Sequence, residues 1–243
     1  MKIFIRDSYD AVSRQAADDA IQLMTSRSQP LICTASGDSP ARLYQQIVER
    51  VEANQLNISN WLFVGLDEWV GMNGTDEGSC RYHLNQQLFN PLHVPEERIC
   101  FFDGRKDELA AECRRVENFI SDHDGIDVAI LGLGMNGHVG MNEPGTSVAG
   151  RSHVTELAET TKKVGQKYFK TQHELKEGIT LGIATLMDAR HIILLVSGKH
   201  KAEIARKVIE EEISERLPAT LLRNHPSLKI YLDKEAATKI IKS

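Results

Sequence analysis

Short apolar runs rich in β-branched residues alternate along this chain with longer segments of helical periodicity, and this alternation constrains the fold most. The apolar runs predict strands, because they are too short for buried helices. Strands that alternate with helices form parallel sheets covered on both faces. The expected fold is therefore α/β: an open, mostly parallel, doubly wound, Rossmann-like sheet of about seven strands, at residues 3–5, 31–34, 61–66, 99–102, 128–131, 192–196 and 228–232.

The segments between these runs place their apolar residues on one helical face. Val12, Ala16 and Ala20 share such a face, as do Leu43 and Ile47. With 243 residues, 41% of them hydrophobic, and no repeat or linker, the chain is expected to form a single domain over residues 1–243. Helices are expected over residues 10–25, 41–51, 80–89, 107–120 and 199–212, and near the C-terminus.

Charge and cysteine usage exclude several classes of protein. The formal net charge is −5 and the basic residues are scattered, so we expect no nucleic-acid partner. No apolar segment approaches the ~20 residues of a membrane span, so we expect no membrane partner and a cytoplasmic location. The cysteines form no C-x-x-C pair and show no zinc-ligand spacing, which predicts reduced thiols without a metal at Cys33, Cys80, Cys100 and Cys113.

The run GLGMNGHVGMNEPG follows the fifth predicted strand and contains a G-x-G-x-x-G pattern. A dinucleotide-binding loop would need a helix to begin at its third glycine, Gly137. Here Gly137 leads into Asn-Glu-Pro-Gly, which is turn chemistry. We therefore favour an active-site loop in which His138 titrates near neutral pH and Glu143 orients it, although simple solvent exposure of both side chains remains the alternative.

A second polar loop ends the third predicted strand with Asp67 and Glu68, followed by Trp69. Neighbouring side chains in an extended segment point to opposite sides, so one of the two carboxylates can face a pocket. Beside an indole that excludes water, that carboxylate would have a raised pKa and could act as a general base. A solvated acidic turn with Trp69 packed over the core is the competing interpretation.

Four motifs in this order, LDEWVG, LGLGMNGHVGMNEPG, GITLGIATLMDA and LLVSGKHKA, resemble the glucosamine-6-phosphate deaminase/isomerase family, which is related to 6-phosphogluconolactonases. The H-x-x-x-N-E-P pattern is typical of the deaminase branch, and the wording is most similar to the galactosamine-6-phosphate subgroup. The resemblance implies ring opening of a 2-amino-2-deoxyhexose 6-phosphate, proton transfer from C2 to C1, and hydrolytic release of ammonia. It implies an amino sugar phosphate as small-molecule partner and no metal or organic cofactor.

The resemblance also assigns roles to individual residues. Asp67 matches the base that takes the C2 proton, His138 the group that handles the ring-oxygen proton, and Glu143 its partner in ring opening. Asn136 stands where some relatives carry aspartate. Its amide can orient His138 or a sugar hydroxyl but cannot shuttle a proton.

The loop TASGDSP matches the family's phosphate loop, between a strand and a helix expected to begin near Pro40. An ordinary Ser/Asp helix cap is the plainer interpretation of this loop. Asp38 departs from the family pattern, because a carboxylate beside bound phosphate is repulsive unless it turns away or binds the sugar. The substrate and phosphate site is expected to comprise Ser36, Gly37, Asp38, Ser39, Gly137, Lys167 and Lys201.

Two alternatives and one regulatory expectation accompany this assignment. A 6-phosphogluconolactonase would use His138 without Asp67 or Glu143, and N-E-P argues against it. A non-catalytic sugar-phosphate sensor is disfavoured because all three acid–base residues are retained. His153 and Thr155 stand where allosteric relatives carry basic residues, so we expect no activation by an N-acetylated sugar phosphate and a monomer or small homo-oligomer.

Overall fold

A computed structural model describes residues 1–241 and contains a seven-stranded sheet in which every neighbouring pair is parallel. The α/β doubly wound fold is thus confirmed, with the expected seven main strands. They lie in the order β1-β10-β9-β6-β2-β3-β5. Their bounds are β1 Lys2–Arg6, β2 Leu31–Thr34, β3 Leu62–Gly65, β5 Ile99–Cys100, β6 Val128–Gly132, β9 His191–Val196 and β10 Leu228–Asp233.

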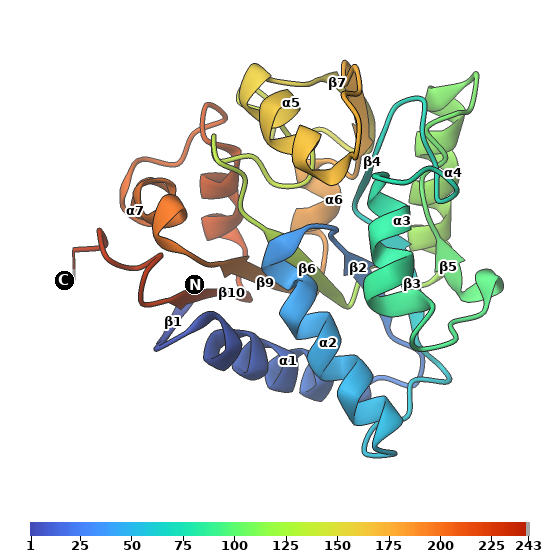
Figure 1. Ribbon diagram of the computed structural model, residues 1–243, viewed down its shortest axis with the longest axis horizontal. Helices are drawn as coiled ribbons and strands as arrows, with labels where there is room; N and C mark the ends of the chain where they lie inside the picture. Colours follow the sequence, from blue (N-terminus) through green and yellow to red (C-terminus); the bar gives the residue numbers. More distant parts are fainter. Residues whose placement is uncertain (242–243) are drawn as a thin grey trace.

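Helices cover both faces of this sheet, because successive residues of its strands are buried on opposite sides. Within β2, Leu31 and Cys33 pack into the core on one face and Ile32 into the core on the other. Figure 1 shows α1 and α2 (blue) on the opposite side of the sheet from α7 (orange). One layer holds α1 (Tyr9–Thr25), α2 (Asp38–Glu52), α3 (Cys80–Leu84) and the π-helix η1 (Asn85–Phe89); the other holds α4 (Leu109–Asp122), α6 (Ile183–Met187), α7 (Ala202–Glu210) and the 3-10 helix η5 (Pro218–Asn224).

Two helix predictions need correction. Helix α2 begins at Asp38 rather than near Pro40, and its N-cap is Gly37. After β10, residues 234–239 form turns instead of a helix, and the carboxylate of Asp233 accepts a hydrogen bond from the backbone N–H of Ala236 at 2.7 Å at the first of these turns. Short 3-10 helices at η2 (Glu96–Arg98) and η4 (Lys199–Lys201) precede β5 and α7.

A second, three-stranded antiparallel sheet was not predicted. It consists of β4 (Asp67–Trp69), β8 (Glu177–Thr180) and β7 (His153–Glu156). Strands of three or four residues show too little alternation to be recognised from sequence. Between β7 and β8 lie the short helix α5 (Glu159–Gly165) and the 3-10 helix η3 (Gln166–Tyr168). We call residues 153–180 the covering segment.

The strand order places a crevice at the centre of the sheet. From β2 the chain continues outward to β3 and β5, whereas from β6 it continues in the opposite direction to β9 and β10. The neighbours β2 and β6 therefore flank a topological switch point, where ligands bind in open α/β sheets. Within residues 1–241, no helix combines the length and the apolar character needed to cross a membrane.

Candidate active site

A cavity of about 440 Å³ opens at the carboxyl ends of β2, β3, β6 and β9, and the covering segment forms its remaining wall. Eight of the predicted site residues line it: Ser36, Gly37, Asp38, Ser39, Asp67, His138, Lys167 and Lys201. Asn136 and Glu143 lie behind His138 and contact each other. Gly137 lies elsewhere, as described below.

Asp67 is the carboxylate that faces the cavity, while the adjacent Glu68 faces the opposite side of β4. Glu68 is fully buried and accepts hydrogen bonds from the backbone N–H groups of Trp69, Cys80 and Arg81 at 2.8, 2.9 and 3.0 Å. It therefore fixes the start of α3. Burial outweighs these hydrogen bonds and raises the pKa of Glu68 to about 7.

The environment of Asp67 suits a general base. Its side chain belongs to a residue only 8% exposed. Burial raises the pKa of Asp67 to about 6, against the opposing effects of the Cys80 thiol and of His138. Trp69 lines the cavity beside it, whereas Val70 packs against the hydrophobic core. The carboxylate is therefore ionised at neutral pH yet basic enough to accept a proton.

His138 is held in a turn that follows β6. A Cβ atom at Gly134 would lie 2.3 Å from the imidazole, so glycine is required there for the ring to reach the cavity. The backbone N–H of His138 donates to the Asn136 side chain at 3.2 Å. Its Nδ1 lies 3.1 Å from Oγ1 of Thr161 and 3.7 Å from Oε2 of Glu143.

Glu143 is an ionised partner behind the imidazole. Asn136 donates to its Oε2 at 2.8 Å, and the backbone N–H of Ala158 donates to its Oε1 at 3.3 Å. Burial alone would favour the neutral acid, but contacts with His138, Thr161 and Asn136 lower the pKa of Glu143 below its ordinary value. Asn136 thus orients the carboxylate, which is a role that an amide can fill.

The glycine pattern of this loop serves the turn and not a dinucleotide. No helix starts at Gly137; residues 133–145 form turns and an isolated bridge between Val139 and Asn142. Gly137 has φ +85°, and its carbonyl accepts a hydrogen bond from the backbone N–H of Ala219 at 2.9 Å. A Cβ there would lie 2.1 Å from Leu217. Gly137 therefore packs against η5 and does not line the cavity, contrary to the expectation that it binds substrate.

The amino end of α2 lies at the end of the cavity that is suited to an anion. Its N-cap Gly37 has φ +108°, and no side chain caps the helix, so the Ser/Asp cap interpretation does not hold. The first-turn N–H groups of a helix without such a cap are suited to an anion. Lys201 is nearby and donates to the carbonyl of Leu133 at 2.5 Å. Burial, with Lys167 contributing, lowers the pKa of Lys201 to about 8.

Asp38 pairs with a lysine of the covering segment. Lys167 Nζ donates to Asp38 Oδ2 at 2.6 Å and lies 4.8 Å from the centre of the Tyr168 ring. The side chain of Asp38 is 77% exposed, so it can turn toward or away from a ligand. The pair joins residues that are 129 positions apart in the chain and closes the cavity at this end.

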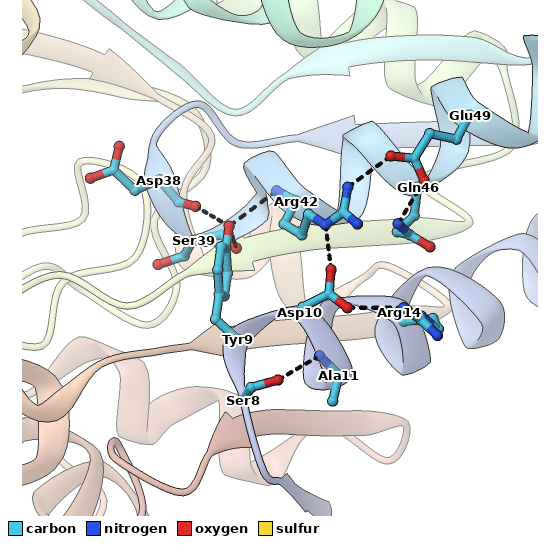
Figure 2. Close-up of polar contacts among 10 residues, drawn as sticks. All are labelled: Ser8, Tyr9, Asp10, Ala11, Arg14, Asp38, Ser39, Arg42, Gln46 and Glu49. Atoms are coloured by element: carbon cyan, nitrogen blue, oxygen red, sulfur yellow. Dashed lines mark hydrogen bonds and ion pairs between the residues drawn. The ribbon is translucent and has the colours of Figure 1, made fainter.

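The first turn of α2 is fixed from outside by Tyr9, as Figure 2 shows. The Tyr9 hydroxyl donates to the carbonyl of Asp38 and lies 3.2 Å from that of Ser39. It also accepts the backbone N–H of Arg42 at 3.0 Å, so it bridges the first helical turn. Arg42 in turn donates to Asp10 at 2.6 Å, which joins α1 to α2. No local sequence signal marks Tyr9.

Several further cavity residues were missed by sequence reasoning. Thr160, Thr161 and Tyr168 come from the covering segment, Cys80 from the start of α3 and His200 from η4. Only His200 lies within one of the quoted motifs, and the five residues come from four elements, with Thr160 and Thr161 both in α5. Among residues 1–241 no three histidine, cysteine, aspartate or glutamate side chains group as a metal site would require.

The fold and this cavity define a class: an α/β protein that holds a buried carboxylate and an imidazole beside a helix end without a side-chain cap. The comparison with known families is consistent with this class. The model of the family described as glucosamine-6-phosphate isomerases/6-phosphogluconolactonase matches residues 6–230. The chain belongs to this family.

Curated relatives match over nearly their full length. The glucosamine-6-phosphate deaminase of Shouchella clausii is 37% identical, with 98% of this chain and 97% of the relative covered. The glucosamine-6-phosphate deaminase 1 of Bacillus subtilis is 34% identical, with 98% and 99% covered. The recognition of the family from its motifs is therefore confirmed.

Solved structures show the same architecture. A structure described as a monomeric glucosamine-6-phosphate deaminase has a TM-score of 0.95 and 34% identity, with 98% of this chain and 100% of that chain covered. A 6-phosphogluconolactonase from Trypanosoma brucei has a TM-score of 0.77 at 19% identity, with 99% and 98% covered. The second likeness extends to the fold alone.

Proposed function

We propose that this protein is a hexosamine-6-phosphate deaminase/isomerase, which converts a 2-amino-2-deoxyhexose 6-phosphate and water into a ketose 6-phosphate and ammonia. One observation carries the proposal: Asp67 and His138 line the same cavity as the uncapped amino end of α2 and Lys201. An acid–base pair beside an anion site is what proton transfer on a sugar phosphate requires. The deaminase names of the curated relatives support the same reaction.

In the proposed reaction His138 opens the sugar ring. It accepts the proton of the C1 hydroxyl and delivers a proton to the ring oxygen, which leaves an open-chain aldehyde at C1. Glu143 stabilises the imidazolium that forms between these two transfers, because its carboxylate is ionised and lies 3.7 Å from Nδ1.

Asp67 then moves a proton from C2 to C1. Removal of the C2 proton, with transfer of a proton from the substrate ammonium to the C1 oxygen, gives an enolamine, and return of the C2 proton to C1 leaves an iminium at C2. Water adds to this carbon, ammonia leaves, and the C2 ketone forms, so one C–N bond is hydrolysed. The residues assigned to this chemistry need no added cofactor, since each step is a proton transfer or the addition of water.

The phosphate end of the cavity supports a 6-phosphate substrate. Ser36 and Ser39 supply hydroxyls, α2 supplies free backbone N–H groups, and Lys201 supplies a positive charge. Lys167 can leave Asp38 for a bound phosphate because both side chains are partly exposed. These donors would anchor the substrate at C6 and place C1 and C2 near the acid–base pair.

The test is ammonia release from glucosamine 6-phosphate and galactosamine 6-phosphate measured side by side, with hydrolysis of 6-phosphogluconolactone as the control reaction. We expect ammonia and a ketose 6-phosphate from at least one amino sugar phosphate and no lactonase turnover. The ratio of the two kcat/KM values identifies the preferred configuration at C4. Lactone hydrolysis without ammonia release would contradict the proposal.

We also expect the rate to follow a hyperbolic curve in substrate concentration. His153 and Thr155 lie on β7 and supply no lysine or arginine for a regulatory phosphate. The measurement is a saturation curve with and without N-acetylglucosamine 6-phosphate. A sigmoidal curve that becomes hyperbolic on its addition would contradict this expectation.

A further inference from the structure

We propose that Thr161 is a positioning residue for His138: its hydroxyl binds the ring nitrogen that also faces Glu143 and fixes which ring nitrogen carries the proton. This inference deepens the proposed function and rests on it for the role of His138. Thr161 is not part of any motif that the sequence offered, and it lies 23 residues from His138 along the chain.

The Thr161 hydroxyl and the Glu143 carboxylate both lie near the same ring nitrogen of His138. Thr161 is buried at 6% exposure on α5, and its Oγ1 lies 3.1 Å from Nδ1 of His138. Glu143 Oε2 is 3.7 Å from the same nitrogen, which is too long for a direct hydrogen bond. Burial would raise the pKa of Glu143, but the nearby side chains of His138, Thr161 and Asn136 together lower it below its ordinary value.

The chemistry of the groups gives the direction of the hydrogen bond between Thr161 and His138. A threonine hydroxyl has one proton and accepts through its lone pairs. Glu143 is ionised and lies 3.7 Å from Nδ1, and a negative charge at that distance favours a proton on this nitrogen. The Nδ1 of His138 must then be the N–H that donates to Thr161. The unprotonated Nε2 is left free to exchange a proton with substrate in the cavity.

The hydrogen bond with Thr161 is the main polar contact at the Nδ1 side of the His138 ring. Its charged neighbours in the described part of the chain are Glu143, behind the ring, and Asp67, across the cavity. Gly134 packs against the ring without offering a side chain. Because Thr161 belongs to α5 and His138 to the loop after β6, the imidazole is oriented by contact between two separate elements.

The test compares Thr161→Val, which removes the hydroxyl but keeps the shape, with Thr161→Ser, which restores it. For Thr161→Val we expect kcat for ammonia release to fall about 10- to 100-fold, with KM changed less than about threefold. Thr161→Ser should keep at least about a third of the wild-type kcat. Thr171→Val, on an exposed part of the covering segment, is the matched control and should behave as wild type.

Two results would overturn the proposal: Thr161→Val retaining more than about a third of kcat, or Thr161→Ser losing as much as Thr161→Val. A second readout needs no substrate. ¹⁵N NMR of histidine-labelled protein, with His138 assigned by its loss in His138→Asn, should show protonation at Nδ1 in wild type and Thr161→Ser and a mixture of tautomers in Thr161→Val. A wild-type enzyme inactive on both sugars would refute the proposed function, while this spectrum would still decide the role of Thr161.

Discussion

Replacing Asp67 with asparagine is expected to lower kcat for ammonia release by at least about 100-fold, with KM nearly unchanged. Asparagine keeps the shape of the side chain and can still accept a hydrogen bond, but it cannot take a proton from C2. A positioned general base contributes about 10²-fold or more. Steady-state ammonia release measures the effect, and a variant with more than about a tenth of the wild-type kcat would contradict the role of Asp67.

The pH dependence gives the same assignment an independent check. Because burial raises the pKa of Asp67 to about 6, the base is protonated and inactive well below that pH. We expect kcat/KM of the wild type to rise as pH increases through about 6 and this limb to vanish in Asp67→Asn. Asp107→Asn, at an exposed position outside the cavity, is the control and should retain the wild-type profile.

Asp67→Asn should also stabilise the folded protein at neutral pH. The pKa of Asp67 is about 6 when folded against an ordinary value of 3.8, so the folded state favours the protonated carboxyl, and its contribution to stability is lost as pH rises from about 4 through 6. That difference corresponds to up to about 3 kcal/mol. Urea unfolding should show Asp67→Asn gaining stability over wild type at pH 7–8, with the gain shrinking toward pH 4.

Replacing Lys201 with methionine is expected to lower kcat/KM by about 10- to 150-fold, mainly through a higher KM. Methionine fills similar space but cannot donate to a phosphate, and a hydrogen bond to a charged group contributes about 1.5–3 kcal/mol. Saturation kinetics provide the measurement. Lys199→Met, at an exposed position outside the cavity, should leave KM unchanged. An unchanged KM in Lys201→Met would refute Lys201 as a phosphate ligand.

The pKa of Lys201 also predicts a change of KM at alkaline pH. Its pKa of about 8, lowered by burial, means that the amine of the free enzyme loses its charge as pH rises through that value. We expect KM to rise above pH 8 in the wild type. An arginine keeps its charge over this range, so KM of Lys201→Arg should stay flat between pH 8 and 9.5, whatever its absolute value.

The fold and the main polar loops could be predicted from sequence because their signals are local. The apolar runs of β2, β3, β6 and β9 are each buried on both faces, so hydrophobicity alone marks them. Since ligands bind at the carboxyl ends of such strands, the residues that follow them were the natural candidates. Asp67 and His138 were found in this way and Lys201 through the family resemblance, and all three line one cavity.

The second sheet and the wall that it supports gave no such signal. Strands β4, β7 and β8 have only three or four residues each, and β7 is half-exposed. The pairing of β4 with β8 joins residues more than 100 positions apart, such as Asp67 with Thr180. Periodicity within one segment contains no information about such a partner.

The sequence by itself determined the doubly wound sheet, the family and the residues that we propose as acid and base, because strand burial and motif spacing act over a few neighbouring positions. Only the tertiary structure decided which groups support those residues. It turned Gly137 toward η5, set Tyr9 against the first turn of α2 and brought Thr161 to His138. These contacts join positions far apart in the sequence, because the packing of whole helices and loops decides which side chains meet.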